Sequence, residues 1–422
     1  MARCCICVLL ATSLSALANS AAAADWPQWR GPDRTGISQE QGLAARWPAA
    51  GPPLLWQVTD IGEGYSAPAV AGDRLFVISN RGVENEFVQA RAVADGKELW
   101  STTLGKVGPN DGPQYPGSRS TPTVDGDLLF ALGSDGELAC LSADKGEVKW
   151  KKSLRGDFGG VPGKWAYSES PLVDGDRLIC TPGGAEATVV ALDKRTGELV
   201  WKAALPEADQ AAYASAIVVD AAGVKQIVQF LEKGLVGLDA ATGKLLWRYT
   251  KTAEGSPANI PTPVASTDHV YSAASRSGGG LVKLAADGAG VGAEQVYFAP
   301  NLPAAIGGSI RLGDYLYGTN SQALMCVEFA SGQIKWQDRS IGASSLVAAE
   351  DRLYLHGENG DVAMVAATPD GYQELGRFTP PNQPERSGRM KAWAYPAVAG
   401  GKLYLRDQGS LWCYDVSAAS GE

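Results

Sequence analysis

Short apolar runs, separated by tight turns rich in glycine and aspartate, recur along almost the whole chain. Residues 119–151 show the pattern clearly, because four such runs alternate there with the turns Asp125-Gly126, Asp135-Gly136 and 144–146. Asp-Gly is a favoured hairpin dipeptide, and the nearly unbroken apolar run 128–132 is typical of a strand covered on both faces. The pattern predicts four short antiparallel strands in meander order.

This four-run unit is repeated, and a glycine four residues before a tryptophan marks each clear copy. The pairs are Gly96–Trp100, Gly146–Trp150, Gly197–Trp201, Gly243–Trp247 and Gly332–Trp336. Counting degenerate copies, the chain holds eight units of roughly 40–50 residues, which is the length of a propeller blade. No unit has a helical apolar period, which excludes ankyrin and tetratricopeptide arrays. We predict an all-β fold, an eight-bladed β-propeller of four-stranded antiparallel blades.

The last copy has only three apolar runs, 394–398, 402–406 and 411–416, whereas Leu54-Leu55-Trp56 stands alone ahead of the first copy. We therefore predict that residues 53–59 supply the fourth strand of the last blade and place Trp56 near Trp412. Such a strand closes the ring and removes two open sheet edges. The expected organisation is an N-terminal segment over residues 25–52, one propeller domain over 53–417 and a short tail over 418–422.

The N-terminus has the features of an export signal. A basic start at residues 1–3 precedes an apolar run over 4–18 and small residues over 21–24. The order predicts a secretory signal peptide over residues 1–24, cleaved near Ala24, and the run is shorter than the about 20 residues of a membrane span. We expect an exported protein, periplasmic or extracellular and at most peripheral to a membrane, with no transmembrane span.

Cleavage would remove Cys4, Cys5 and Cys7 and leave four cysteines, Cys140, Cys180, Cys326 and Cys413. An even number in an oxidising compartment is compatible with disulfides. Their spacing is wide, however, and most of them lie inside strand-like apolar runs. We expect them to be small buried hydrophobic residues.

Composition restricts the chemistry without naming a reaction. The chain has 422 residues, is 45% hydrophobic and carries a net charge of −9, which excludes wholesale disorder and disfavours a nucleic-acid partner. Its two histidines, His269 and His356, lie in strand-like runs away from other metal-ligating residues, so we expect no metal site there.

The repeat resembles that of the quinoprotein-like (PQQ-like) propeller family, whose motif is matched in full by residues 191–201, ALDKRTGELVW. Residues 25–32, DWPQWRGP, are similar to the segment that precedes the propeller in secreted bacterial members. Two groups share this architecture: PQQ-dependent alcohol and sugar dehydrogenases, and outer-membrane assembly factors similar to BamB, which bind protein partners.

The dehydrogenase resemblance implies PQQ with Ca²⁺, adjacent disulfide-bonded cysteines and a set of Glu, Asn and Asp ligands. The one adjacent pair, Cys4-Cys5, lies in the predicted signal peptide. Glu169 and Asn259 precede predicted inner strands, but no Asp partner occurs in a matching context. The BamB-like group is usually lipid-anchored through a cysteine after the signal, and the chain has none there.

The first hypothesis is therefore a non-catalytic, monomeric propeller without cofactor that binds a protein partner in the bacterial cell envelope. The alternatives are a divergent PQQ-dependent oxidoreductase of alcohols or sugars, and a propeller that binds carbohydrate or peptide.

Two sets of residues carry this hypothesis. Loops between blades bind more often than strands do, and the longest ones cover residues 105–117, 156–167 and 378–393. Five residues occupy similar positions just before the predicted inner strands, and we expect them to converge at the mouth of the axial channel. They are Tyr65, Arg119, Glu169, Tyr213 and Tyr395. The repeated tryptophans are instead expected to pack blade against blade. They are Trp56, Trp100, Trp150, Trp201, Trp247 and Trp336.

Overall fold

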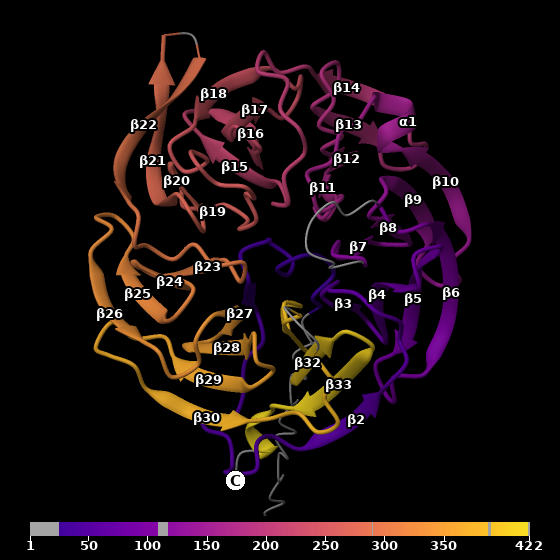
Figure 1. Cartoon of the computed structure of the whole chain (residues 1–422), viewed down its shortest axis with the longest axis vertical. Helices are drawn as coiled ribbons and strands as arrows, with labels where there is room; N and C mark the ends of the chain where they lie inside the picture. Colours follow the sequence, from indigo (N-terminus) through magenta and orange to yellow (C-terminus); the bar gives the residue numbers. More distant parts are fainter. Residues whose placement is uncertain (1–24, 109–116, 289, 387–389, 421–422) are drawn as a thin grey trace, which may run out of the picture.

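The computed structural model describes residues 25–108, 117–288, 290–386 and 390–420. The predicted signal peptide, residues 1–24, lies outside the described residues, as do most of the 105–117 loop and the last two residues of the predicted tail. Within these ranges the chain forms eight sheets that follow one another around a ring in chain order (Figure 1). The predicted all-β, eight-bladed propeller is confirmed.

The first four blades are numbered in chain order. Blade 1 comprises β3 (Ala69–Ala71), β4 (Arg74–Arg81), β5 (Asn85–Ala92) and β6 (Glu98–Gly105). Blade 2 comprises β7 (Thr123–Asp125), β8 (Leu128–Leu132), β9 (Glu137–Ser142) and β10 (Val148–Ser153). Blade 3 comprises β11 (Leu172–Asp174), β12 (Arg177–Cys180), β13 (Val189–Asp193) and β14 (Leu199–Ala203). Blade 4 comprises β15 (Ile217–Ala221), β16 (Val224–Leu231), β17 (Gly234–Asp239) and β18 (Leu245–Tyr249).

The remaining blades complete the ring. Blade 5 comprises β19 (Val264–Ala265), β20 (His269–Ala274), β21 (Gly278–Asp287) and β22 (Gly290–Ala299). Blade 6 comprises β23 (Ser309–Leu312), β24 (Tyr315–Thr319), β25 (Leu324–Glu328) and β26 (Ile334–Asp338). Blade 7 comprises β27 (Ser344–Ala349), β28 (Arg352–Gly357), β29 (Val362–Ala366), β30 (Glu374–Phe378) and β1 (Ile37–Ser38). Blade 8 comprises β31 (Ala397–Ala399), β32 (Lys402–Asp407), β33 (Ser410–Asp415) and β2 (Leu54–Val58). A short helix, α1 (Leu154–Phe158), follows blade 2, and a 3₁₀ turn, η1 (Ala418–Ser420), follows blade 8.

The ring closes through the predicted N-terminal strand. β2 pairs antiparallel with β33, so that Gln57 lies opposite Trp412 and Trp56 opposite Cys413. The Asp415 amide donates to the Pro53 carbonyl (2.9 Å), which extends the pairing beyond the strand. The predicted closure is therefore confirmed, and β2 supplies the fourth, outermost strand of blade 8.

The four-strand prediction is incomplete for blade 7. β1 runs parallel to the inner strand β27, with Ile37 opposite Ala348 and Ser38 opposite Ala349, so this sheet has five strands. The additional strand comes from the N-terminal segment, residues 25–52, which the sequence pattern left outside the propeller.

Most repeat tryptophans contact the neighbouring blade. The indole Nε1 groups of Trp56, Trp100, Trp150, Trp201 and Trp336 each donate to a backbone carbonyl of the next blade, at 2.7–3.3 Å. Trp247 differs, because its Nε1 donates to Gln226 of its own blade (2.6 Å). Two residues that the tryptophan pattern missed take the same position. Tyr297 lies against Gly332 and donates to the Phe329 carbonyl (3.0 Å), and Phe378 lies against Gly51.

The glycine of the repeat allows this packing, and two glycines make a matched test. Gly243 and Gly223 both have φ +75°, but a Cβ on Gly243 would lie 2.5 Å from the Trp201 ring, whereas a Cβ on Gly223 would meet nothing within 4 Å. We expect Gly223→Ala to lower the free energy of unfolding by about 1–2 kcal/mol through its backbone conformation alone. Gly243→Ala should cost a further 1–3 kcal/mol or so, because the ring is displaced. Urea denaturation of both variants measures the difference, and equal losses would contradict a packing role for the tryptophan.

The core lies between the facing sheets of neighbouring blades, and the four cysteines belong to it. Cys140, Cys180, Cys326 and Cys413 are all buried and free, as predicted. Burial raises the pKa of each thiol, to about 11 for Cys326 and to about 12 for Cys140 and Cys413. Among the described residues, no helix combines the length and apolar character needed to cross a bilayer.

Candidate functional site

The two ends of the ring differ in the chain segments that form them. Each blade is a meander, so the connectors between blades and the turns between second and third strands lie at one end, which we call the connector face. The turns between first and second strands, and between third and fourth strands, lie at the opposite end, which we call the turn face. A binding loop at one face is therefore separated from the other face by the length of the inner strands.

The N-terminal segment crosses the middle of the ring (Figure 1, indigo). Trp26 exchanges backbone hydrogen bonds with Val70 of blade 1 (2.8 Å each way), and the Pro27 carbonyl accepts from Val124 of blade 2 (2.8 Å). Farther along, the Trp29 indole donates to Thr262 ahead of blade 5 (2.8 Å). These bonds join the N-terminal segment to blades 1 and 2 and to the connector before blade 5, on different sides of the ring.

The end of the N-terminal segment extends these contacts to blade 8. The Ser38 hydroxyl donates to the Val398 carbonyl (2.8 Å). The Glu40 carboxylate accepts from the amides of Gly400 (2.7 Å) and Gly401 (2.9 Å). The segment therefore reaches both the first and the last blade.

Three of the five predicted mouth residues come together at the connector face. The Arg119 guanidinium lies over the Tyr65 ring, 5.7 Å from its centroid, and donates to the Trp165 carbonyl (3.1 Å). The Trp165 amide donates to the Tyr213 hydroxyl (3.1 Å), and the two rings lie 5.8 Å apart. At the other end, the Tyr65 ring lies 5.3 Å from that of Trp393.

We call Trp393, Tyr65, Arg119, Trp165 and Tyr213 the aromatic row. Its members come from five consecutive connectors, those before blades 8, 1, 2, 3 and 4. Trp165 and Trp393 were not in the predicted set, although each is an aromatic residue near the end of a long connector, which is a signal that the sequence carried. The row is a continuous arc of aromatic and cationic side chains on one face of the ring.

The other two predicted mouth residues lie apart from the row. The Glu169 carboxylate is buried and accepts hydrogen bonds from the Thr181 amide and from Gln229 Nε2 (3.1 Å). Burial raises the pKa of Glu169 to about 7, against the opposing effects of Thr181 and Arg34. The Tyr395 ring is buried 4.5 Å from that of Trp29, and its hydroxyl donates to the Ile306 carbonyl (2.8 Å). Both side chains are bonded within the protein.

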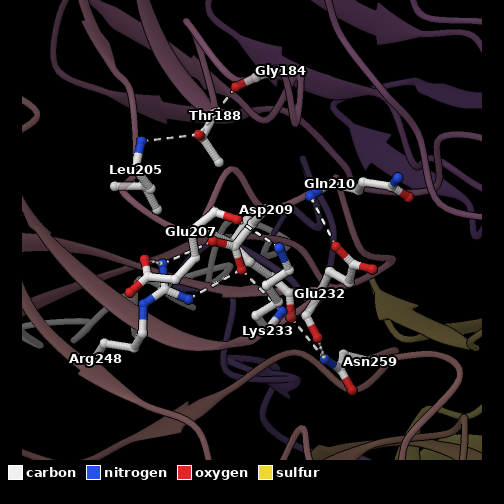
Figure 2. A network of polar contacts seen from close by, with 11 residues as sticks. Gly184, Thr188, Leu205, Glu207, Asp209, Gln210, Glu232, Lys233, Arg248 and Asn259 are labelled. Carbon is white, nitrogen blue, oxygen red and sulfur yellow. Dashed lines mark hydrogen bonds and ion pairs between the residues drawn. The ribbon is translucent and has the colours of Figure 1, made fainter.

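A polar network fixes the connector that carries Tyr213 (Figure 2). Asp209 is fully buried and accepts from both Nη atoms of Arg248 (3.1 and 2.8 Å) and from the Lys233 amide (2.9 Å). The Asn259 side-chain amide donates to the carbonyls of Leu231 (2.7 Å) and Glu232 (3.0 Å). The backbone carbonyl of Asn259 accepts from the Tyr213 amide (3.1 Å). The network holds Tyr213 at the end of the row.

The described residues do not fit the quinone and calcium site that the dehydrogenase resemblance implies. The four cysteines lie in four different blades, so none of them can form a vicinal disulfide. Within the described ranges, no group of three or more His, Cys, Asp or Glu side chains is placed to hold a metal ion. Glu169 and Asn259, the two ligand candidates, are both used in hydrogen bonds within the protein.

A sequence profile of the family described as outer membrane protein assembly factor BamB matches residues 84–338, which is more than half of the chain. The chain belongs to this BamB family. Its membership agrees with the resemblance to PQQ-like propellers that the repeat motif indicated.

Individual relatives of this BamB-family chain match only in part. Polyvinylalcohol dehydrogenase from Sphingopyxis sp. (strain 113P3) is 31% identical over 172 residues, which cover 34% of this chain and 24% of the relative. The assembly factor BamB of Shewanella oneidensis is 27% identical over 167 residues, which cover 39% of this chain and 40% of that protein. The chain therefore spans between a quarter and two fifths of these relatives' own lengths.

A solved structure extends the likeness of fold to most of the chain. The crystal structure of BamB from Moraxella catarrhalis superimposes with a TM-score of 0.59 at 17% identity, covering 86% of this chain and 97% of that protein. At this identity the likeness concerns the fold.

Proposed function

We propose that this chain is an exported, non-catalytic scaffold of the bacterial cell envelope. In this proposal the aromatic row binds a protein of the machinery that assembles outer membrane proteins. The row carries the proposal, because five consecutive connectors direct aromatic and cationic residues to one face of a rigid ring. The class of partner is inferred from the matched family and from its members in other bacteria, which are named as outer membrane protein assembly factors.

The chemistry of the row is that of a protein interface. Tyrosine, tryptophan and arginine are enriched at the centres of interfaces and among residues that dominate binding energy. Next to the row, the exposed Lys164 ammonium lies over the Trp165 ring, 5.7 Å from its centroid, and Val161 is an exposed apolar residue. The hydrogen bonds of Arg119 and Tyr213 to the Trp165 backbone order the Arg119 and Tyr213 side chains in advance, which reduces the entropy lost on binding.

The dehydrogenase alternative has one observation in its favour, the partial match to polyvinylalcohol dehydrogenase. The arrangement of the cysteines, and of Glu169 and Asn259, opposes it. A dye-linked oxidation assay with alcohols and sugars, in the presence of PQQ and Ca²⁺, separates the two functions. We expect no turnover above that of a denatured sample, and saturable turnover would overturn the scaffold proposal.

Binding is tested with Trp165→Ala in the full mature chain. We expect this variant to weaken binding of a purified outer-membrane assembly protein from the same cells by about 10-fold or more, as is common for a buried aromatic anchor. The Trp165 backbone bonds to Arg119 and Tyr213 do not depend on its side chain, so the row should keep its shape. Surface-immobilised binding assays measure the affinity.

The matched control is Lys244→Ala, an exposed side chain of the turn between β17 and β18 on the turn face. It should leave the affinity unchanged. A photo-crosslinking residue at position 164, but not at position 244, should form an adduct with the same partner. Equal affinity of the Trp165→Ala variant and the native protein, or adducts from position 244 alone, would place the partner elsewhere.

A further inference from the structure

A second candidate site lies on the axis, away from the aromatic row. A hollow of about 330 Å³ separates the N-terminal segment from the inner strands of blades 4, 5 and 6. Its lining includes residues 217–220 of β15, residues 263–267 around β19 and Arg311 of β23. Asp220, Ser266 and Thr267 belong to the turn-face ends of blades 4 and 5. The hollow therefore reaches toward the turn face.

Three arginines line this hollow: Arg30, Arg34 and Arg311. The first two are almost completely buried, with 3% and 4% of their surface exposed. Among the described residues, none of the three forms an ion pair with a carboxylate. A buried cation is normally paired with an anion, because the loss of hydration costs several kcal/mol or so. This hollow thus has more positive than negative side chains in its lining.

The hydrogen bonds of the two buried guanidiniums leave donors unused. Arg30 Nη2 donates to the carbonyls of Ser309 (2.5 Å) and Thr35 (2.9 Å). Arg34 Nη1 and Nη2 donate to the carbonyls of Pro171 (2.9 Å) and Ser170 (2.7 Å). The buried Nε atoms of Arg30, Arg34 and Arg311 have no acceptor within the described part of the chain.

The surrounding charges do not neutralise the three arginines. Asp33 and Asp220 also line the hollow, but both are exposed to solvent. The negative charge of Glu169 raises the pKa of Arg34. The Glu169 carboxylate, however, is already bonded to Thr181 and Gln229. Burial, together with the like charge of Arg30, lowers the pKa of Arg34 to about 9, which still leaves Arg34 protonated at neutral pH.

The backbone holds both buried arginines in an unfavourable conformation. Arg30 has φ +60° and Arg34 has φ +55°, the left-handed region that residues with a Cβ seldom adopt. Such conformations are retained where the surrounding structure fixes them, and they concentrate at functional positions. Here they occur at two arginines that line the same hollow.

We propose that this axial hollow binds a small anion through a carboxylate or phosphate group. The guanidiniums of the three lining arginines, Arg30, Arg34 and Arg311, would hold the anion. Guanidinium groups match the oxygen geometry of both carboxylate and phosphate, which is why arginine predominates at such sites. The proposal is independent of the partner function, because the hollow and the aromatic row involve different residues.

Isothermal titration of the full mature chain with inorganic phosphate and with succinate tests this site and distinguishes the two chemistries. We expect saturable binding of at least one of them with a Kd of about 1 mM or tighter. Arg311→Gln is the informative variant, because Arg311 is only partly buried and its Nε has no partner to lose. It should weaken binding about 10-fold or more, as expected for a lost charge-assisted hydrogen bond.

Arg276→Gln, an exposed arginine in the turn between β20 and β21, is the matched control and should bind as the native chain does. Arg34→Gln should remove measurable binding, and its thermal unfolding identifies any loss through misfolding. The proposal is overturned if neither anion gives saturable heat with the native protein. It is also overturned if Arg311→Gln and Arg276→Gln bind the anion equally well.

Discussion

Replacing Arg406 with methionine is expected to lower the free energy of unfolding by about 4 kcal/mol. Arg406 lies on β32 of blade 8, is completely buried and donates across the seam into blade 1 and the connector that precedes it. Its acceptors are the carbonyls of Ser66 (3.1 Å), Ile78 (2.7 Å), Gly62 (3.3 Å), Glu63 (3.1 Å) and Gln408 (3.1 Å), and the Ser79 hydroxyl (2.9 Å).

The size of the effect follows from what methionine leaves behind. A guanidinium has five N–H donors, and here they bond to six acceptors. Two of these acceptors have a second donor: the Glu63 carbonyl also accepts from the Asn80 amide (3.0 Å), and the Ser79 hydroxyl from Gln89 Nε2 (3.2 Å). Methionine fills a similar volume without any donor. Each carbonyl left buried and unpaired costs about 1–3 kcal/mol, reduced where water enters. Burial already lowers the pKa of Arg406 to about 9, so part of the loss is offset by removing a buried charge.

Arg406→Lys separates hydrogen bonding from packing. Lysine keeps the positive charge but has three donors, so its loss of stability should fall between that of the native protein and that of the methionine variant. Arg276→Met, at an exposed turn, should change stability by less than about 0.5 kcal/mol. Urea denaturation measures all three. If the methionine variant is as stable as the native protein, the backbone pairing of β2 with β33 closes the ring without help from Arg406.

The fold could be predicted from the sequence because the blade pattern is local. Turn dipeptides such as Asp125-Gly126 and the apolar runs around them fix the strands of each blade. The missing fourth strand of blade 8 then requires the isolated run around Trp56. The Asp-x-x-Thr-Gly turns have an equally local cause. Asp193 Oδ1 accepts from the amides of Arg195 and Thr196 (2.9 Å each), and Asp239 Oδ1 accepts from Ala241 (3.0 Å) and Thr242 (2.8 Å).

The N-terminal segment could not be placed in the same way, because its partners are distant in sequence and follow no repeat. Arg30 bonds to Ser309 and Arg34 to Ser170, and nothing in the local sequence of either arginine identifies those carbonyls. The parallel pairing of β1 with β27 likewise depends on tertiary contacts, because the local sequence of β1 does not distinguish β27 from the other inner strands. The repeat pattern therefore predicted the ring of blades but not the position of the N-terminal segment within it.

The candidate site was predictable in position and only partly in composition. Equal offsets before the inner strands brought Tyr65, Arg119 and Tyr213 to one face. Glu169 and Tyr395 lie three and two residues before their inner strands instead of four, and both side chains are buried within the protein. Glu169 points to Thr181 and Gln229, and Tyr395 packs on Trp29, a residue whose axial position the sequence did not reveal.

Two carboxylates that share one arginine show how burial decides the strength of an ion pair. Asp209 and Glu207 both lie 2.8 Å from Arg248 Nη2, but the Asp209 side chain is 0% exposed and that of Glu207 is 44% exposed. We expect Asp209→Asn to lower the free energy of unfolding by about 3–4 kcal/mol, since removing one partner leaves a buried charge uncompensated. Glu207→Gln should cost about 0.5 kcal/mol, as for an exposed pair screened by water.

Geometry adds to the effect of the charge at Asp209. Its two oxygens accept three donors, two from Arg248 and one from the Lys233 amide. An asparagine has one acceptor oxygen, so its Nδ2 must face a donor and at least one hydrogen bond is lost. Because this network holds the connector of Tyr213, the variant should also increase amide hydrogen exchange around residues 205–213, whereas Glu207→Gln should not. Equal losses of stability in the two variants would show that Arg248 is held by its surroundings and not by the buried carboxylate.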